Sequence, residues 1–164
     1  MMRSHATTLL IGVGNPFRRD DGVGSVIVRR LQHHLPPHVA LIEQTGDGAD
    51  LLEAWKGFHT VILVDAVQSG EGPGTIQRID ACAEKLPAWF SHCSTHAFGV
   101  AEAIELARTM GDLPLRLIIY AIEGLDFSAG TDLSPEIAAS VEEAAALVLH
   151  ELRQLSAAPA ALSS

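Results

Sequence analysis

The sequence predicts a single three-layer α/β domain, in which a mostly parallel β-sheet carries helices on both faces and includes one short antiparallel strand. Short apolar runs that suit buried strands alternate along the chain with stretches that suit helices. Two of these runs, residues 61–64 and 117–119, are apolar without any alternation. Such runs are typical of parallel strands covered by helices on both sides.

The predicted elements follow one another in the order β-α-β-α-β-β-α-β-α. Strands are expected at residues 7–13, 39–43, 60–65 and 116–122, and helices at 22–34, 50–56 and 96–109. The short strand 74–79 follows a turn rich in glycine and is expected to pair antiparallel with a neighbour. Right-handed crossovers between the parallel strands would place helices on both faces of the sheet.

The last helix has the clearest signals. Ser134 suits the N-cap, Pro135 the first helical position and Glu136 the positive end of the helix dipole. An apolar stripe then follows at spacings of three or four residues: Ile137, Val141, Ala144, Val148, Leu152 and Leu155. We therefore expect one domain over residues 1–155 and a flexible C-terminal tail over residues 156–164.

Composition narrows the class of protein. A chain of 164 residues with 48% hydrophobic residues fits one domain with a substantial core. The net charge of −9, without an extended basic stretch, argues against a nucleic-acid partner. No apolar run approaches the ~20 residues that span a bilayer, and the first residues lack a signal-peptide core. Cys82 and Cys93 form neither a disulfide framework nor a CxxC pair, so we expect a cytoplasmic protein.

Three strand or helix ends carry residues with catalytic or metal-binding chemistry. Ligands of an open parallel sheet bind beyond the carboxyl ends of its strands. Asp20 and Asp21 lie in the glycine-rich segment after the first strand, and one of them is expected to cap the next helix, leaving the other free. Asp65 ends the third strand, where burying a carboxylate is costly without a function. His96 opens a predicted helix, which favours the neutral imidazole that binds metals.

Two carboxylates and an imidazole suit zinc, nickel or another divalent metal. A dinucleotide site is a poorer interpretation of the same segment. Phe17 replaces the third glycine of GxGxxG, and Asp20 and Asp21 put negative charge where a pyrophosphate would bind. Cys93 precedes His96 by three positions but has no second such pair, so we interpret it as a packed thiol.

A longer motif extends these observations over nearly the whole chain. The chain resembles the endopeptidases that mature the large subunit of nickel–iron hydrogenases, from about residue 9 to residue 155. The resemblance rests on Gly12-x-Gly14-Asn15-x-x-x-x-Asp20-Asp21-Gly22-x-Gly24, on Asp65-Ala66 and on Ser94-x-His96. Shorter matches are Thr45-Gly46-Asp47-Gly48, Pro73-Gly74-Thr75 and Leu133-Ser134-Pro135-Glu136.

The resemblance implies that Asp21, Asp65 and His96 are both the metal ligands and the catalytic residues. Many relatives have glutamate at the position of Asp21, and Asp20 stays an alternative ligand. The implied activity removes a C-terminal extension from the nickel-loaded large-subunit precursor. Nickel, supplied in the substrate, would be the recognition element, so we expect weak or no permanently bound metal. We also expect a monomer. The metal would polarise the scissile carbonyl or activate a water, with Asp21 or Asp65 as base.

Two other functions stay open at this point. A nickel-sensing chaperone that holds the precursor without cutting it would carry the same three ligands. A peptidase-like relative that acts on an unrelated protein would carry them too. The absence of HExxH and GxSxG motifs gives no support to a zincin or a serine hydrolase.

Overall fold

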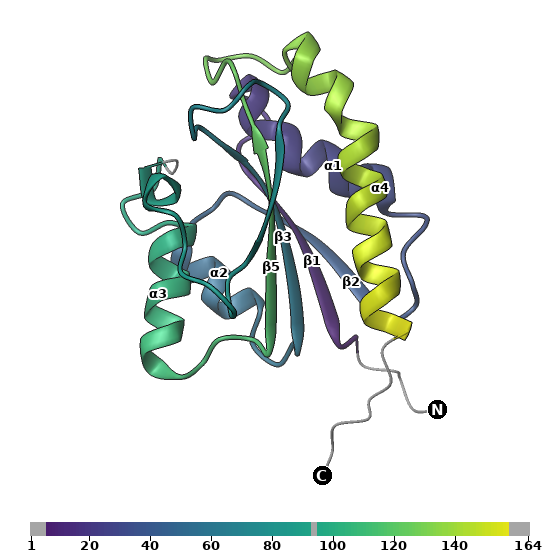
Figure 1. The fold of residues 1–164 in the computed structure, drawn as a ribbon, viewed down its shortest axis with the longest axis vertical. Helices are drawn as coiled ribbons and strands as arrows, with labels where there is room; N and C mark the ends of the chain where they lie inside the picture. Colours follow the sequence, from purple (N-terminus) through teal and green to yellow (C-terminus); the bar gives the residue numbers. More distant parts are fainter. Residues whose placement is uncertain (1–5, 93–94, 158–164) are drawn as a thin grey trace.

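The centre of the molecule is a five-stranded sheet, seen in a computed structural model that describes residues 6–92 and 95–157 (Figure 1). The strand order is β2-β1-β3-β5-β4. Four strands are parallel: β1 (Thr8–Val13), β2 (Val39–Gln44), β3 (Thr60–Val67) and β5 (Arg116–Glu123). The edge strand β4 (Ile76–Asp80) pairs antiparallel with β5. The predicted fold class and order of elements are therefore confirmed.

The helices cover both faces of this sheet. Figure 1 shows α1 (Val23–Leu31) and α4 (Pro135–Ala157) on one face, and α2 (Gly48–Ala54) and α3 (Val100–Met110) on the other. Each pair closes a separate apolar core against the sheet. Two short 3-10 helices, Arg19–Gly22 and Ala88–His92, precede α1 and α3.

The α4 helix is amphipathic in the way its sequence predicts. Five of the six stripe residues are buried and Leu155 is partly buried against the same core: Ile137, Val141, Ala144, Val148, Leu152. The carbonyl of Ser134 accepts the first helical hydrogen bonds, from the N–H groups of Ile137 and Ala138. The helix continues through Ala157, two residues into the segment predicted as a tail, and residues 158–164 lie outside the described residues.

Helix α3 begins four residues later than predicted, at Val100 rather than at His96. The N–H of Gly99 donates to the carboxylate of Glu102, and the carbonyl of Gly99 accepts from Ala103, so the first helical turn forms there. His96 therefore lies in the bend that precedes the helix. The prediction that His96 lies at a helix N-terminus is wrong, and so is the reason it gave for a neutral imidazole.

β1 and β3 are neighbours in the sheet although β2 lies between them in the sequence. The strand that follows β1 is added on one side of it and the later strands on the other, so the strand order changes direction between β1 and β3. A crevice at the carboxyl ends of two such strands is the usual ligand site of this architecture. The pairing of β1 with β3 ends at Gly12 and Val64, whereas β3 pairs with β5 for three residues more. Asp65 is thus the first residue of β3 beyond the reach of β1.

Within residues 6–92 and 95–157, none of the helices combines the length and the apolar character needed to cross a membrane.

Candidate functional site

The backbone path of the loop after β1 requires a glycine at position 14. Gly14 has φ of +137°, and a Cβ at this position would lie 1.9 Å from the carbonyl oxygen of Asp21. Only glycine fits such a close approach with a positive φ. The N–H of Asn15 then donates to Oδ2 of Asp21 at 2.8 Å. The two ends of the loop are thus held together, and the Asp21 carboxylate is fixed beside the end of β1.

The neighbouring carboxylates of Asp20 and Asp21 have separate environments. Asp20 is fully buried and accepts hydrogen bonds from the N–H groups of Leu125, Asp126 and Ser134 and from the Ser134 hydroxyl, at 2.7–2.9 Å. Burial alone would raise the pKa of Asp20, but these hydrogen bonds together hold the pKa below its usual value. Asp20 therefore joins the first loop to the β5–α4 connection, rather than capping its own helix.

Arg19 also binds the first loop to the β5–α4 connection. It has φ of +45°, an uncommon conformation for a residue other than glycine. Its N–H donates to the carbonyl of Gly130, and its guanidinium pairs with Asp126 at 3.3 Å. These contacts come from the same β5–α4 connection that binds Asp20. The loop is thus fixed from outside by the second half of the chain.

Asp21, Asp65 and His96 line one small cavity at the carboxyl ends of β1 and β3. Its volume is about 20 Å³, enough for roughly one water-sized sphere. The cavity is also lined by residues from the end of β1 and the loop after it, the loop after β2, the 3-10 helix and bend before α3, and the first turn of α3: Val13, Gly14, Thr45, Gly46, Phe90, Thr95, Val100 and Ala101. The three predicted site residues are thus brought together, and Asp20 is not among them.

The charged form of Asp65 is disfavoured in this cavity. Burial raises its pKa well above the usual value, and the negative charge of Asp21 raises it further. The hydrogen bond from the Ala66 backbone offsets only part of this. A cation bound beside Asp65 would stabilise its charged form.

The segment that carries His96 packs against the loop after β2. A Cβ on Gly46, whose φ is +101°, would lie 3.7 Å from the His96 ring. A Cβ on Gly48 would collide with the Phe98 ring at 2.3 Å, and the Gly48 N–H donates to the Phe98 carbonyl at 2.8 Å. Gly46 is therefore required by its positive φ, and Gly48 by the close approach of Phe98. Cys93 and Ser94, which the sequence placed near this site, lie outside the described residues.

The donor chemistry of the cavity fits a divalent metal, since two carboxylates and an imidazole are common ligands of zinc and nickel. In the described part of the chain, however, no three His, Cys, Asp or Glu side chains are arranged so that they could hold a metal ion. The three residues share a cavity without forming a ready chelate. An ion that contacts all three would draw them closer together.

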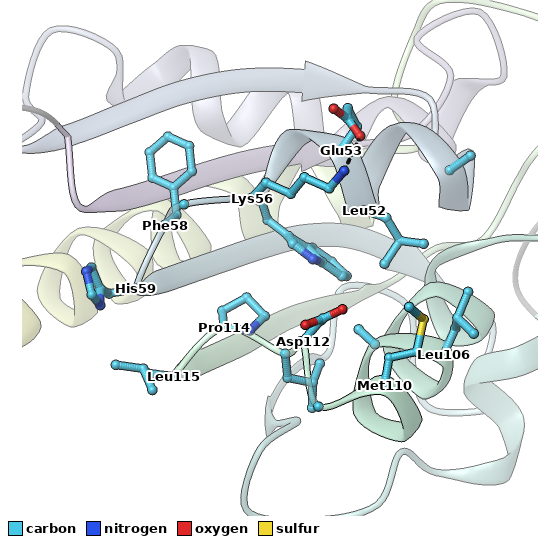
Figure 2. A pocket seen from close by; sticks show the side chains of 16 residues that line it. Leu52, Glu53, Lys56, Phe58, His59, Leu106, Met110, Asp112, Pro114 and Leu115 are labelled. Atoms are coloured by element: carbon cyan, nitrogen blue, oxygen red, sulfur yellow. Dashed lines mark hydrogen bonds and ion pairs between the residues drawn. The ribbon is translucent and has the colours of Figure 1, made fainter.

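A larger cavity, of about 860 Å³, lies between α2 and α3 (Figure 2). Its lining is mostly apolar, and the carboxylate of Glu53 pairs there with Lys56 at 2.7 Å. Size alone would favour this cavity as the active site. We place the chemistry in the smaller one, because two carboxylates and an imidazole line it and the pKa of one carboxyl is raised well above its usual value.

The sequence marked Thr45 and Gly46 as a motif match but did not place them at the site, and it gave no sign of Phe90, Val100 or Ala101 there. Thr45 and Gly46 lie after β2, whose carboxyl end meets the same sheet edge, so the rule of strand ends applies to them as well. Asn15, which holds Asp21 through its N–H, gives no signal beyond its place in the long motif.

Comparison with known proteins gives a consistent result. A family model described as hydrogenase maturation protease matches residues 26–151. Hydrogenase 2 maturation protease of Escherichia coli is 29% identical over 150 residues, covering 89% of this chain and 90% of that protein. The hydrogenase expression/formation protein HupD of Rhodobacter capsulatus is 30% identical over 88% of this chain and 70% of its own length. The structure of the hydrogenase maturating endopeptidase HybD from E. coli has a TM-score of 0.79, with 29% identity, 90% coverage of this chain and 93% of that chain.

Proposed function

Because this chain belongs to the hydrogenase maturation protease family and is a hydrolase, we propose that it removes the C-terminal extension of a nickel-loaded [NiFe]-hydrogenase large-subunit precursor. Nickel in the precursor is the recognition element in this proposal. The protein acts in the cytoplasm as a monomer and holds little or no metal of its own. The function assigned to the relatives by name supports the reaction class.

One observation carries the assignment of the site. The carboxylates of Asp21 and Asp65 lie at one ion-sized cavity, together with His96, at the point where the sheet reverses its growth. Burial, and then the charge of Asp21, raise the pKa of Asp65, so a positive charge bound beside it would stabilise its ionised form. A divalent ion presented by the substrate supplies this charge. The cavity thus favours substrate that carries the ion over substrate that lacks it.

The residues have distinct roles in the proposed reaction. Asp21 is held from the side by the Asn15 N–H and serves as a ligand to the substrate's nickel, as does His96. Asp65 lines the same cavity, and in its ionised form its carboxylate would accept a proton from the attacking water. The peptide bond of the precursor is then broken by addition of water, and the proton passes to the leaving amine.

Incubation with matched precursors tests this function. The large-subunit precursor is prepared with and without nickel, each form is incubated with the protein, and the product masses are measured. We expect one C-terminal fragment from the nickel-loaded form and none from the nickel-free form. Binding of the loaded form without any change of mass would instead identify a nickel-sensing chaperone. Cleavage of both forms alike would contradict the role of nickel in recognition.

A further inference from the structure

A further pocket, of about 290 Å³, lies against the N-terminal half of α3. We call it the α3 pocket. Its lining comes from the segment before α3 and from the helix itself: Leu86, Pro87, Ala88, Ser91, Ala101 and Glu105, completed by Lys85. The large cavity between α2 and α3 has no lining residue in common with the small cavity of the candidate site, whereas the α3 pocket does.

The α3 pocket and the small cavity are neighbours. Ala101, in the first turn of α3, lines both of them. The 3-10 helix before α3 also lines both, with Phe90 at the small cavity and with Ala88 and Ser91 at the α3 pocket. The Ser91 hydroxyl donates to the Ala88 carbonyl at 3.0 Å, which fixes the part of this helix that faces the pocket. A polypeptide that lies at the small cavity therefore has a second binding pocket beside it.

The pocket extends only a short way along α3. Ala101 and Glu105 are four positions apart, so their side chains lie on the same face of the helix. Four residues of α-helix rise by roughly 6 Å. About two residues of extended chain cover this distance. Whatever the pocket binds is thus close in sequence to the part of the polypeptide at the small cavity.

The two voids suit different chemical groups. The small cavity, of about 20 Å³, admits an ion or a water but no side chain. The volume of the α3 pocket is roughly ten times the share of one water in the liquid, so it admits a side chain. Lys85 and Glu105 carry opposite charges, and Glu105 also lies 3.6 Å from the Arg108 guanidinium. Since the other lining residues are mostly apolar, the pocket favours an uncharged, apolar side chain.

We propose that the α3 pocket receives an apolar side chain of the precursor, from a residue within about three positions of the bond cleaved at the Asp21–Asp65–His96 cavity. This inference rests on the proposed function, because it takes the precursor as the substrate. Any occupant of the pocket lies beside the substrate's ion, which favours the substrate itself over a second copy of this chain. The ion fixes one point of the precursor, and the side chain in the pocket fixes the direction in which the chain runs past the small cavity.

Two variants that fill the pocket test this binding role. Ala88 and Glu105 are exposed and come from different elements, and Ala88→Trp or Glu105→Trp places an indole in the pocket. We expect the dissociation constant for the nickel-loaded precursor to rise roughly tenfold or more in each. Ala146→Trp and Glu143→Trp are the matched controls, at exposed positions of α4 across the sheet, and should bind as the wild type does. Thermal melts identify any variant that fails to fold.

Changes in the precursor identify the side chain that enters the pocket. The product mass gives the scissile bond, and the residues beside it are replaced one at a time by aspartate. In the wild type, one replacement should raise the dissociation constant roughly tenfold or more. The same replacement should have little further effect in Ala88→Trp, because the pocket is already filled. Effects that simply add for every precursor residue would contradict the proposal.

Binding and cleavage are measured separately, so that this proposal and the proposed function fail in different ways. Wild-type protein that binds the precursor without cutting it would refute the cleavage, while the dissociation constants of the folded Trp variants would still decide the role of the pocket. Cleavage by the wild type, with unchanged binding in Ala88→Trp and Glu105→Trp or equal weakening in the α4 controls, would refute the pocket alone. Wild type that does not bind the precursor would refute both. A wild-type dimer in sedimentation experiments that dissociates in Ala88→Trp would assign the pocket to a second copy and overturn the proposal.

Discussion

Asp65 and Asp21 line the same cavity of about 20 Å³, where burial and then the charge of Asp21 raise the pKa of Asp65. Neither residue is part of the apolar cores that hold the two helical layers on the sheet. At neutral pH their proximity costs folding free energy and contributes nothing to packing. A cation bound at the cavity would offset that cost in folding free energy.

Asp65→Asn should raise the free energy of unfolding at neutral pH. The folded state holds a proton on Asp65 above pH 3.8, where the unfolded chain has largely lost it, so wild-type stability falls as the pH rises through this range. Each pH unit by which folding raises the pKa costs about 1.4 kcal/mol at neutral pH. Urea unfolding between pH 3.5 and 8 measures the effect. The variant and wild type should converge at the acidic end, and a difference that stays constant across the range would contradict this account.

Asp20→Asn should destabilise the fold by about 2–4 kcal/mol, because it removes a charged acceptor from several buried donors. The pKa of Asp20 is lowered in the folded protein, so its contribution is present above the unfolded pKa of 3.8 and is lost as the pH falls through the folded value. Ser134→Ala, which removes only the hydroxyl donor, should cost about 1–2 kcal/mol. Urea unfolding at pH 7 should rank Asp20→Asn below Ser134→Ala, and equal stabilities would refute the anchoring role.

Substitutions at Asp21 and His96 should separate chemistry from folding. Asp21→Asn retains an oxygen that can accept from the Asn15 N–H but loses the charge, so precursor cleavage should fall by roughly 100-fold or more. Asp21→Glu retains the charge and should keep part of the activity. His96→Ala should abolish cleavage while the melting temperature stays near that of the wild type, because His96 lies in a bend at the edge of the core. Loss of cleavage that merely follows loss of thermal stability would point to a structural role instead.

Purified protein should be folded and nearly free of metal, and treatment with a chelator should leave its melting temperature almost unchanged. Three ligands leave coordination positions open, unlike the closed four-ligand cages of structural zinc. A structural metal would behave in the opposite way, since its binding energy is part of the folding energy. Elemental analysis after dialysis, followed by thermal melts with and without chelator, gives the answer. Stoichiometric metal whose removal unfolds the protein would identify a permanently metallated hydrolase.

The sequence predicts the sheet well because continuous apolar runs have few other structural explanations. The predicted ends of strands and helices are wrong where contacts with segments distant in the sequence determine them. Strand β3 extends two residues past Asp65 because β5 continues to pair with it. The apolar residues from His96 onward resemble the start of a helix, but Phe98 instead packs on Gly48 and its carbonyl accepts the Gly48 N–H. No local pattern contains that contact.

The choice between Asp20 and Asp21 shows the same limit at the site. Both are acids in one glycine-rich segment, and the neighbouring residues do not indicate which of the two carboxylates lies at the cavity. The hydrogen bonds from Leu125, Asp126 and Ser134 make Asp20 a buried anchor and leave Asp21 at the cavity. The partners of Asp20 are far away in the sequence, so only the folded chain reveals the difference.

The anchoring of Asp20 also bears on how the protein emerges from the ribosome. Its hydrogen-bond partners Leu125 and Ser134 are 105 and 114 residues downstream, so a nascent chain that already contains β1, β2 and β3 still lacks them. At that stage the Asp20 carboxylate still lacks its hydrogen-bond donors from the β5–α4 connection. We therefore expect the first loop to reach its final form only after residues 125–134 have been synthesised.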